Sequence, residues 1–181
     1  VPTREFLTNL TAVAQMLVDA SAGILHCHMK HIVHRDVASR NFLVDPFQRV
    51  TVCDFGLARF LPPGEDVGQA AVGELLPLQW AAPEALAMGL LSEKTDVYSF
   101  GVFLHEIVSR GDPFPGVHPL EAARQVLAGV RPVIPAWCAS AWATLMQQCW
   151  EVTPAHRPTM QAVYESLRGF HHSCATALNA C

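Results

Sequence analysis

The segment from residue 32 to residue 56 constrains the fold of this chain more than any other. It holds two short runs rich in β-forming residues, 41–44 and 50–53, which Asp45-Pro-Phe-Gln-Arg49 connects. A five-residue connection that contains Asp-Pro suits a β-hairpin with a longer loop. The sequence therefore predicts a hairpin whose two open ends lie side by side.

Polar residues flank that hairpin in a fixed order. Asn41 enters the first strand, Asp54 follows the second, and Asp36 stands five residues before Asn41. Because the open ends of a hairpin meet, the side-chain oxygens of Asn41 and Asp54 should face one point. Such oxygens can hold Mg²⁺ together with phosphates, and a carboxylate nearby can accept a proton from an attacking hydroxyl. The alternative is a stable hairpin with ordinary turn aspartates.

The composition is that of a folded globular domain. The chain has 181 residues, of which 51% are apolar and 15% are charged, so it is long enough for a sizeable core and too apolar for disorder. A net charge of −4 gives no reason to expect nucleic-acid binding. The sequence contains no run of 18 apolar residues, so we expect no membrane span. Its six scattered cysteines favour reduced thiols over a disulfide framework.

The rest of the chain is expected to be mainly helical. Apolar residues at helical spacing predict helices over the ranges 10–28, 94–110, 120–129, 139–150 and 159–168. The second of these is apolar on all faces, so we expect it to be buried. The last should end at Gly169, a good C-terminal stop, and residues 170–181 are expected to form a frayed tail.

A histidine-rich run ends the first of these helices. His26 and His28 are two residues apart, so on a helix they point to different faces, which argues against a shared metal ion. We expect His26, His28 and His31 to be solvated or hydrogen-bonded locally.

The order His34-Arg35-Asp36, then Asn41, then Asp54-Phe55-Gly56 resembles the catalytic loop and metal-binding motif of protein kinases. By this resemblance Asp36 is the catalytic base, and Asn41 and Asp54 hold Mg²⁺ beside bound ATP. Leu43 matches the apolar residue on which the adenine ring rests.

The resemblance extends over residues 7–170 and implies a fold. We expect a mainly α structure with a small β-hairpin at the cleft, namely the large C-terminal lobe of a two-lobed α+β protein kinase domain. This lobe should occupy residues 1–170, with a tail over 171–181.

By the same resemblance, several further residues support the catalytic loop. His34 should pack under Phe55, and Asp96 should hydrogen-bond the backbone of the catalytic loop. Arg157 should pair with Glu84 of the Ala-Pro-Glu motif, a pair whose disruption would be costly if it is buried.

Two stretches resemble tyrosine kinases in particular. Ala38 stands where serine/threonine kinases commonly have Lys, and Arg40 completes the sequence Asp-Val-Ala-Ser-Arg-Asn. A guanidinium at Arg40 can steady both the base and an incoming phenol while staying charged. Pro77 and Trp80 precede Glu84 as in the substrate-binding stretch of tyrosine kinases, where a rigid apolar platform suits a flat phenol ring.

The resemblance thus implies a protein tyrosine kinase, which transfers the γ-phosphoryl group of ATP to a tyrosine-containing protein with the help of Mg²⁺. Two alternatives remain open. One is a catalytically silent scaffold or binding module derived from a kinase, and the other is a serine/threonine or dual-specificity kinase.

The segment 57–84 departs from the family pattern because it contains no Ser, Thr or Tyr. Many kinases order this activation segment by phosphorylation, and the phosphate then pairs with basic residues such as the Arg of His-Arg-Asp, here Arg35. We hypothesise that Glu65, Asp66 or Glu74 supplies a fixed negative charge to Arg35 instead.

The parts of a kinase domain that cover and align the phosphates are not found in the sequence. It has no Gly-x-Gly-x-x-Gly stretch before the catalytic loop and no Val-Ala-x-Lys strand. We expect an upstream small lobe in a longer parent protein, and we expect residues 1–181 alone to bind ATP poorly and to transfer phosphoryl groups negligibly. The parent should act on the cytoplasmic side, as a soluble kinase or as the intracellular part of a receptor.

Overall fold

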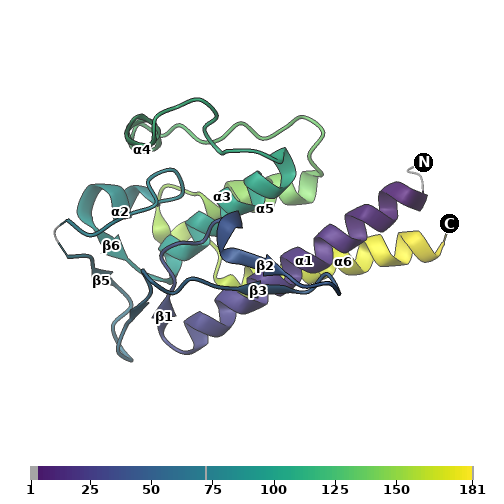
Figure 1. Ribbon diagram of the computed structural model, residues 1–181, viewed down its shortest axis with the longest axis horizontal. Coiled ribbons are helices and arrows are strands. Elements are labelled where there is room, and N and C mark those ends of the chain that lie inside the picture. Colours follow the sequence, from purple (N-terminus) through teal and green to yellow (C-terminus); the bar gives the residue numbers. More distant parts are fainter. Residues whose placement is uncertain (1–3, 72, 181) are drawn as a thin grey trace.

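The computed structural model describes residues 4–71 and 73–180, and helices dominate it (Figure 1). The fold class expected from the sequence is confirmed. The α-helices are α1 (Arg4–Met29), α2 (Pro83–Met88), α3 (Glu93–Ser109), α4 (Pro119–Leu127), α5 (Ser140–Cys149) and α6 (Met160–Asn179). Short 3₁₀ turns cover Ser39–Asn41 and Pro154–His156. The strands are β1 (Ile32–Val33), β2 (Phe42–Val44), β3 (Val50–Val52), β4 (Arg59–Phe60), β5 (Gly68–Gln69) and β6 (Leu90–Leu91).

The strands pair into small antiparallel sheets rather than one large one. β2 pairs with β3 and forms the hairpin predicted from the sequence, with Leu43 opposite Thr51. Asp45 shapes its loop, because its Oδ1 accepts hydrogen bonds from the backbone N–H groups of Phe47 at 2.8 Å and Arg49 at 2.9 Å. The other pairs are β1 with β4 and β5 with β6. They tie the loops on either side of the site to the helical body.

Helix α3 forms the centre of the core, as its all-round apolar sequence predicted. Phe100 and Leu104 are fully buried. A Cβ added at Gly101 would lie 2.7 Å from Cβ of Cys149, so α5 can approach α3 this closely only where the side chain is a hydrogen. A capping box between Ser92 and Thr95 fixes where α3 begins.

Helix α1 is longer than the predicted range and packs beside α6 (Figure 1). Its Thr8–Met29 portion is long and apolar enough to cross a membrane by length and composition. In the structure this helix lines the core, where Ala14, Leu17 and Ile24 are buried. A core helix of this kind needs the same apolar composition as a span.

The prediction that the last helix ends at Gly169 and leaves a frayed tail was wrong. Helix α6 continues without a break to Asn179. Glycine in a helix costs about 1 kcal/mol relative to alanine, but burial of the following turns outweighs that cost. Phe170 contacts Trp142 with ring centroids 4.9 Å apart, and Cys174 is buried.

The cysteines within the described residues are free thiols, as the sequence predicted. Burial raises the pKa of the Cys149 thiol to about 12, so this side chain behaves as a small apolar group in the contact between α3 and α5.

Candidate active site

The open end of the hairpin brings Asn41 and Asp54 to the same place in the fold. The backbone N–H of Cys53 donates to the carbonyl of Asn41 at 2.9 Å, which closes this end. Asn41 is buried, and its Nδ2 donates to the carbonyl oxygen of Asp36 at 2.7 Å, so its Oδ1 is the oxygen left for a cation. Asp54 has a left-handed backbone with φ of 60°, and its Oδ1 accepts the N–H of Gly56 at 3.1 Å.

The donor set suits Mg²⁺ held jointly with phosphates. The Asp54 carboxylate and the Asn41 amide provide hard oxygens, the kind of ligand that Mg²⁺ takes from proteins in small number. Within residues 4–71 and 73–180, no group of three or more His, Cys, Asp or Glu side chains could hold a metal ion. A cation at this site would therefore complete its coordination with nucleotide phosphates and water.

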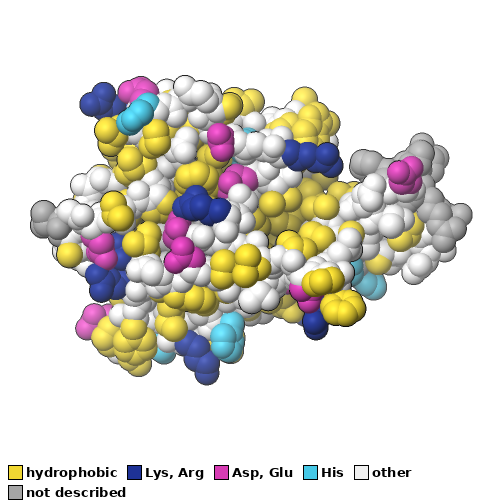
Figure 2. Space-filling view, in the orientation of Figure 1, with side chains coloured by type: hydrophobic (Ala, Val, Ile, Leu, Met, Phe, Trp, Pro, Cys, Tyr) yellow, Lys and Arg dark blue, Asp and Glu magenta, His cyan; other side chains and the backbone are white. Residues whose placement is uncertain are grey.

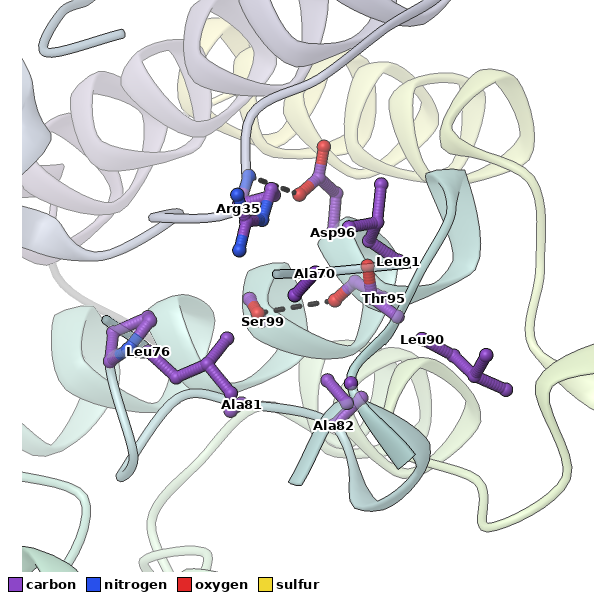
Figure 3. Close-up of a pocket in the computed structure, with 13 residues that line it drawn as sticks. Arg35, Ala70, Leu76, Ala81, Ala82, Leu90, Leu91, Thr95, Asp96 and Ser99 are labelled. Carbon is purple, nitrogen blue, oxygen red and sulfur yellow. Dashed lines mark hydrogen bonds between the residues drawn. The ribbon is translucent and has the colours of Figure 1, made fainter. Parts of the chain in front are cut away.

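A buried carboxylate on α3 holds the catalytic loop in shape. Asp96 is fully buried, and its Oδ2 accepts the backbone N–H of His34 at 2.7 Å. Its Oδ1 accepts the backbone N–H of Arg35 at 2.8 Å (Figure 3). Arg35 has φ of 70°, a left-handed conformation that a non-glycine residue keeps only when its surroundings enforce it. The predicted contact between Asp96 and this loop is confirmed.

His28 also donates to Asp96, which the sequence did not reveal. His28 is buried rather than solvated or locally bonded, and its Nε2 lies 3.0 Å from Oδ2 of Asp96. Its Nδ1 lies 3.9 Å from Glu93. A fully buried carboxylate needs several donors to offset its lost hydration, and His28 is the third of them. The prediction for this histidine was wrong because its partner is 68 residues away along the chain.

His34 connects the two halves of the site. The backbone N–H of Asp36 donates to its Nδ1 at 3.3 Å, while its Nε2 lies 3.1 Å from the carbonyl of Cys53, the residue before Asp54. A neutral imidazole with its proton on Nε2 satisfies both contacts. The ring packs on Phe55 with centroids 5.0 Å apart, as predicted.

Asp36 is tied to the expected substrate platform through Arg40. The guanidinium of Arg40 forms an ion pair with Oδ1 of Asp36 and lies over the ring of Trp80, 4.6 Å from its centroid. Such a stack favours Arg over Lys because the guanidinium is planar. The carboxylate of Asp36 is thereby oriented from the same side as Trp80.

Glu106 is a site residue that sequence reasoning missed. Its Oε2 accepts Nε1 of Trp80 at 2.7 Å and the backbone N–H of Ser39 at 3.1 Å, and its Oε1 accepts the Ser39 hydroxyl at 2.7 Å. One carboxylate on α3 therefore fixes the catalytic loop and the platform relative to each other. The available signal was an acidic residue inside a strongly apolar helix, which requires buried partners.

Pro77 and Ala81 line a small cavity of about 20 Å³ together with Arg35 and Ser99; Figure 3 shows Arg35, Ala81 and Ser99 around it. That volume is close to one water molecule. The hydroxyl of Ser99 donates to the carbonyl of Trp80 at 2.8 Å, so the platform rests directly on α3.

Of the three acids proposed as partners of Arg35, the structure selects Glu74. Its Oε1 accepts Nη1 of Arg35 at 2.8 Å, whereas Glu65 and Asp66 are exposed and form no ion pair among the described residues. The hydrogen bond from Arg35, followed by that from the N–H of Ala71, lowers the pKa of Glu74 to about 2.

The platform is anchored at its far end by Glu84 and Arg157, whose predicted pairing is confirmed. Nη1 and Nη2 of Arg157 donate to the two Glu84 oxygens at 2.6 and 2.8 Å. The Arg157 side chain is fully buried and that of Glu84 is 10% exposed. This buried fork fixes where α2 begins relative to the helical body.

Apolar side chains on the hairpin and just after it are open to solvent. The exposed fraction is 61% for Leu43, the residue expected under an adenine ring, 57% for Val44 and 48% for Phe55. Figure 2 shows apolar side chains over the region of β2 and β3. This surface is available to a flat apolar ligand or to another segment of protein.

Comparison with known proteins gives one consistent result. The family model described as protein tyrosine and serine/threonine kinase matches residues 3–167. The chain is 37% identical over 162 residues to the tyrosine protein-kinase src-1 of Caenorhabditis elegans, which covers 86% of this chain and 30% of that relative. It is 38% identical over 150 residues to the human tyrosine-protein kinase Srms, covering 82% of this chain and 30% of that protein. The chain thus spans less than a third of the length of these curated relatives.

Proposed function

Because the chain belongs to the family of protein tyrosine and serine/threonine kinases, we propose that the protein containing it transfers the γ-phosphoryl group of ATP to tyrosine side chains of proteins. One observation carries the choice of tyrosine. The carboxylate of Asp36 is joined through Arg40 to the ring of Trp80, which places a base beside a rigid aromatic platform that suits a phenol.

In this proposal each residue acts through a contact already described. Asp36 accepts the proton of the tyrosine hydroxyl, and Arg40 keeps that carboxylate oriented. Pro77 and Trp80 seat the phenol, and Glu106 holds Trp80 in place through its indole N–H. Most of the rate enhancement then comes from positioning and from charge neutralisation.

Asn41 and Asp54 would hold the magnesium ion of Mg·ATP, and Leu43 would support the adenine ring. When bound, Mg·ATP would supply the phosphoryl group, and its magnesium ion would neutralise negative charge on the phosphate oxygens. His34 keeps the two oxygen ligands in register, because it contacts the backbone of both the catalytic loop and Cys53.

A small lobe supplied by the parent protein would cover the exposed hairpin. Leu43, Val44 and Phe47 are all more than half exposed, a surface that a nucleotide and a covering lobe would remove from water. We propose that residues 1–170 are the catalytic large lobe of this larger kinase domain. We also propose that the parent protein works on the cytoplasmic side, where ATP and Mg²⁺ are supplied.

The test is phosphoryl transfer by the parent protein to a mixed pool of Tyr, Ser and Thr peptides with Mg·ATP. Two variants accompany it: Asp36→Asn, which removes the proposed base, and Glu121→Gln, which removes an exposed carboxylate on α4 as a matched control. We expect labelling of tyrosine only, its loss in Asp36→Asn and no change in Glu121→Gln.

Other results would contradict specific parts of the proposal. Labelling confined to Ser or Thr would show that Arg40 and the platform do not select a phenol. Absence of labelling with a folded protein that binds Mg·ATP would favour a catalytically silent scaffold, since the oxygens of Asn41 and Asp54 would then serve binding alone.

A further inference from the structure

One carboxylate joins three separate stretches of chain near the active site. Oε1 of Glu74 accepts Nη1 of Arg35 in the catalytic loop at 2.8 Å and Nη2 of Arg59 in β4 at 2.6 Å. Oε2 accepts the backbone N–H of Ala71 in its own loop at 2.9 Å. We call Glu74, Arg35 and Arg59 the charge latch.

The charge latch gives the buried guanidinium of Arg35 the counter-ion that it needs. The side chain of Arg35 is 3% exposed and that of Glu74 is 17% exposed. A buried cation without a counter-ion is strongly unfavourable, and Glu74 is the one acidic side chain paired with Arg35 among the described residues. Nη1 of Arg35 also donates to the carbonyl of Leu57 at 3.0 Å, so the same guanidinium contacts segment 57–84 at two places, Leu57 and Glu74.

The sequence shows that phosphorylation of a hydroxyl in segment 57–84 cannot provide this charge. Residues 57–84 contain no Ser, Thr or Tyr, so no hydroxyl exists there to carry a phosphate. A phosphate opposite an Arg cluster orders a loop by adding charge-assisted hydrogen bonds. The Glu74 carboxylate accepts charge-assisted hydrogen bonds of the same kind from Arg35 and Arg59. Its negative charge is that of the unmodified side chain.

We propose that Glu74 is a positioning residue that keeps residues 57–71 and 73–84 ordered by its own charge, so that this protein acts without phosphorylation of that segment. Glu74 works through Arg35, the neighbour of Asp36 in the chain, and through the short connection to Pro77. Loss of the latch should therefore disturb both the base and the substrate platform. The consequence for catalysis rests on the kinase function proposed above, whereas the ordering of the loop does not.

The first test measures order without any reaction. Hydrogen exchange of backbone amides in residues 57–76 is compared in the parent protein and in Glu74→Ala, Glu74→Gln and a matched control, Asp66→Asn. We expect faster exchange over this range in both Glu74 variants, unchanged exchange in α3, and wild-type behaviour in the control. Unchanged exchange in Glu74→Ala would overturn the proposal.

Acetate provides a sharper version of this test. Removing the Glu74 carboxylate leaves Arg35 and Arg59 facing a space that a small carboxylate ion fits. Added acetate should slow exchange over 57–76 in Glu74→Ala but have no such effect on wild type. A loop that loosened only because of poor packing would not respond to the anion.

The second test measures activity. We expect Glu74→Ala to lower kcat/KM for a tyrosine peptide by about tenfold, and we expect phosphatase treatment to leave the wild-type rate unchanged. A fall in the wild-type rate after phosphatase treatment, or full activity in Glu74→Ala, would contradict the proposal. If wild type transfers no phosphoryl group at all, the proposed function fails, and the exchange measurements alone decide whether Glu74 orders the loop.

Discussion

Replacing Arg157 by methionine should lower the free energy of unfolding by about 3–5 kcal/mol, the range expected when one partner of a buried ion pair is removed. The structure explains why this site should reach that range. The Arg157 side chain is fully buried and that of Glu84 is 10% exposed, so water cannot take the place of the lost guanidinium.

All five N–H groups of Arg157 have acceptors. Besides the two oxygens of Glu84, its guanidinium donates to the carbonyl oxygens of Glu151 at 2.7 Å, Lys94 at 2.9 Å and Val152 at 3.2 Å. Methionine fills a similar volume but offers no donor, so one carboxylate and three carbonyls each lose the hydrogen bonds that Arg157 donates to them. The cost is therefore larger than that of a surface ion pair, which is about 0–1 kcal/mol.

The assay is urea unfolding of the wild type, Arg157→Met, Glu84→Met and the double variant. A loss of about 3–5 kcal/mol should also lower the midpoint of thermal unfolding by about 6–20 °C for a chain of this size. The double variant should be more stable than the sum of the single losses predicts, because neither charge is then left buried alone.

Additivity of the two single changes within about 0.5 kcal/mol would refute this reasoning. It would mean that Glu84 and Arg157 do not depend on each other despite their close contact. The exposed pair of Arg124 with Glu121, whose N and O atoms are 3.7 Å apart, provides the matched control. A double-mutant cycle on this pair should show a coupling free energy near zero.

Further predictions concern packing, a buried hydroxyl, the charge latch and the platform. Gly101→Ala should lower the unfolding free energy by about 1 kcal/mol net, because strain of about 1–3 kcal/mol against Cys149 exceeds the helix-propensity gain; urea unfolding measures it. Tyr98→Phe should raise that free energy by about 1 kcal/mol in the same assay, since the buried Tyr98 hydroxyl has no hydrogen-bond partner among the described residues. The pKa of Glu74 falls from 4.5 in the unfolded chain to about 2, so its contribution to stability is complete above about pH 4.5 and is lost as the pH falls through 2. The stability difference between wild type and Glu74→Gln, measured by urea unfolding at several pH values, should shrink over that interval. Glu106→Gln should lower kcat/KM of the parent for a tyrosine peptide by about 10- to 100-fold through misplacement of the platform, measured by steady-state kinetics.

Features that depend on neighbouring residues were predictable from the sequence. The hairpin follows from two β-rich runs around an Asp-Pro loop, and burial of α3 follows from its all-round apolar pattern. The order of Asp36, Asn41 and Asp54 along the chain indicates the site without any structural information. The contacts of Asp96 and Arg157 were predicted through a family resemblance, since no local pattern reveals them.

Contacts between residues far apart in sequence were not predictable in the same way. The choice of Glu74 among three nearby acids depends on where β4 and the catalytic loop place Arg59 and Arg35. The burial of His28 depends on α3, and the role of Glu106 depends on two segments that meet only in the folded chain. Sequence pattern shows that such a side chain needs a partner but does not say which one.

The end of α6 illustrates the same division. Gly169 is a good local stop signal, yet the helix continues because Phe170 and Cys174 gain burial against the helical body. The sequence by itself determined which residues can carry the chemistry and in what order they occur. The tertiary structure decided which charges meet and where α6 ends, because these depend on burial and on partners that only folding brings within reach.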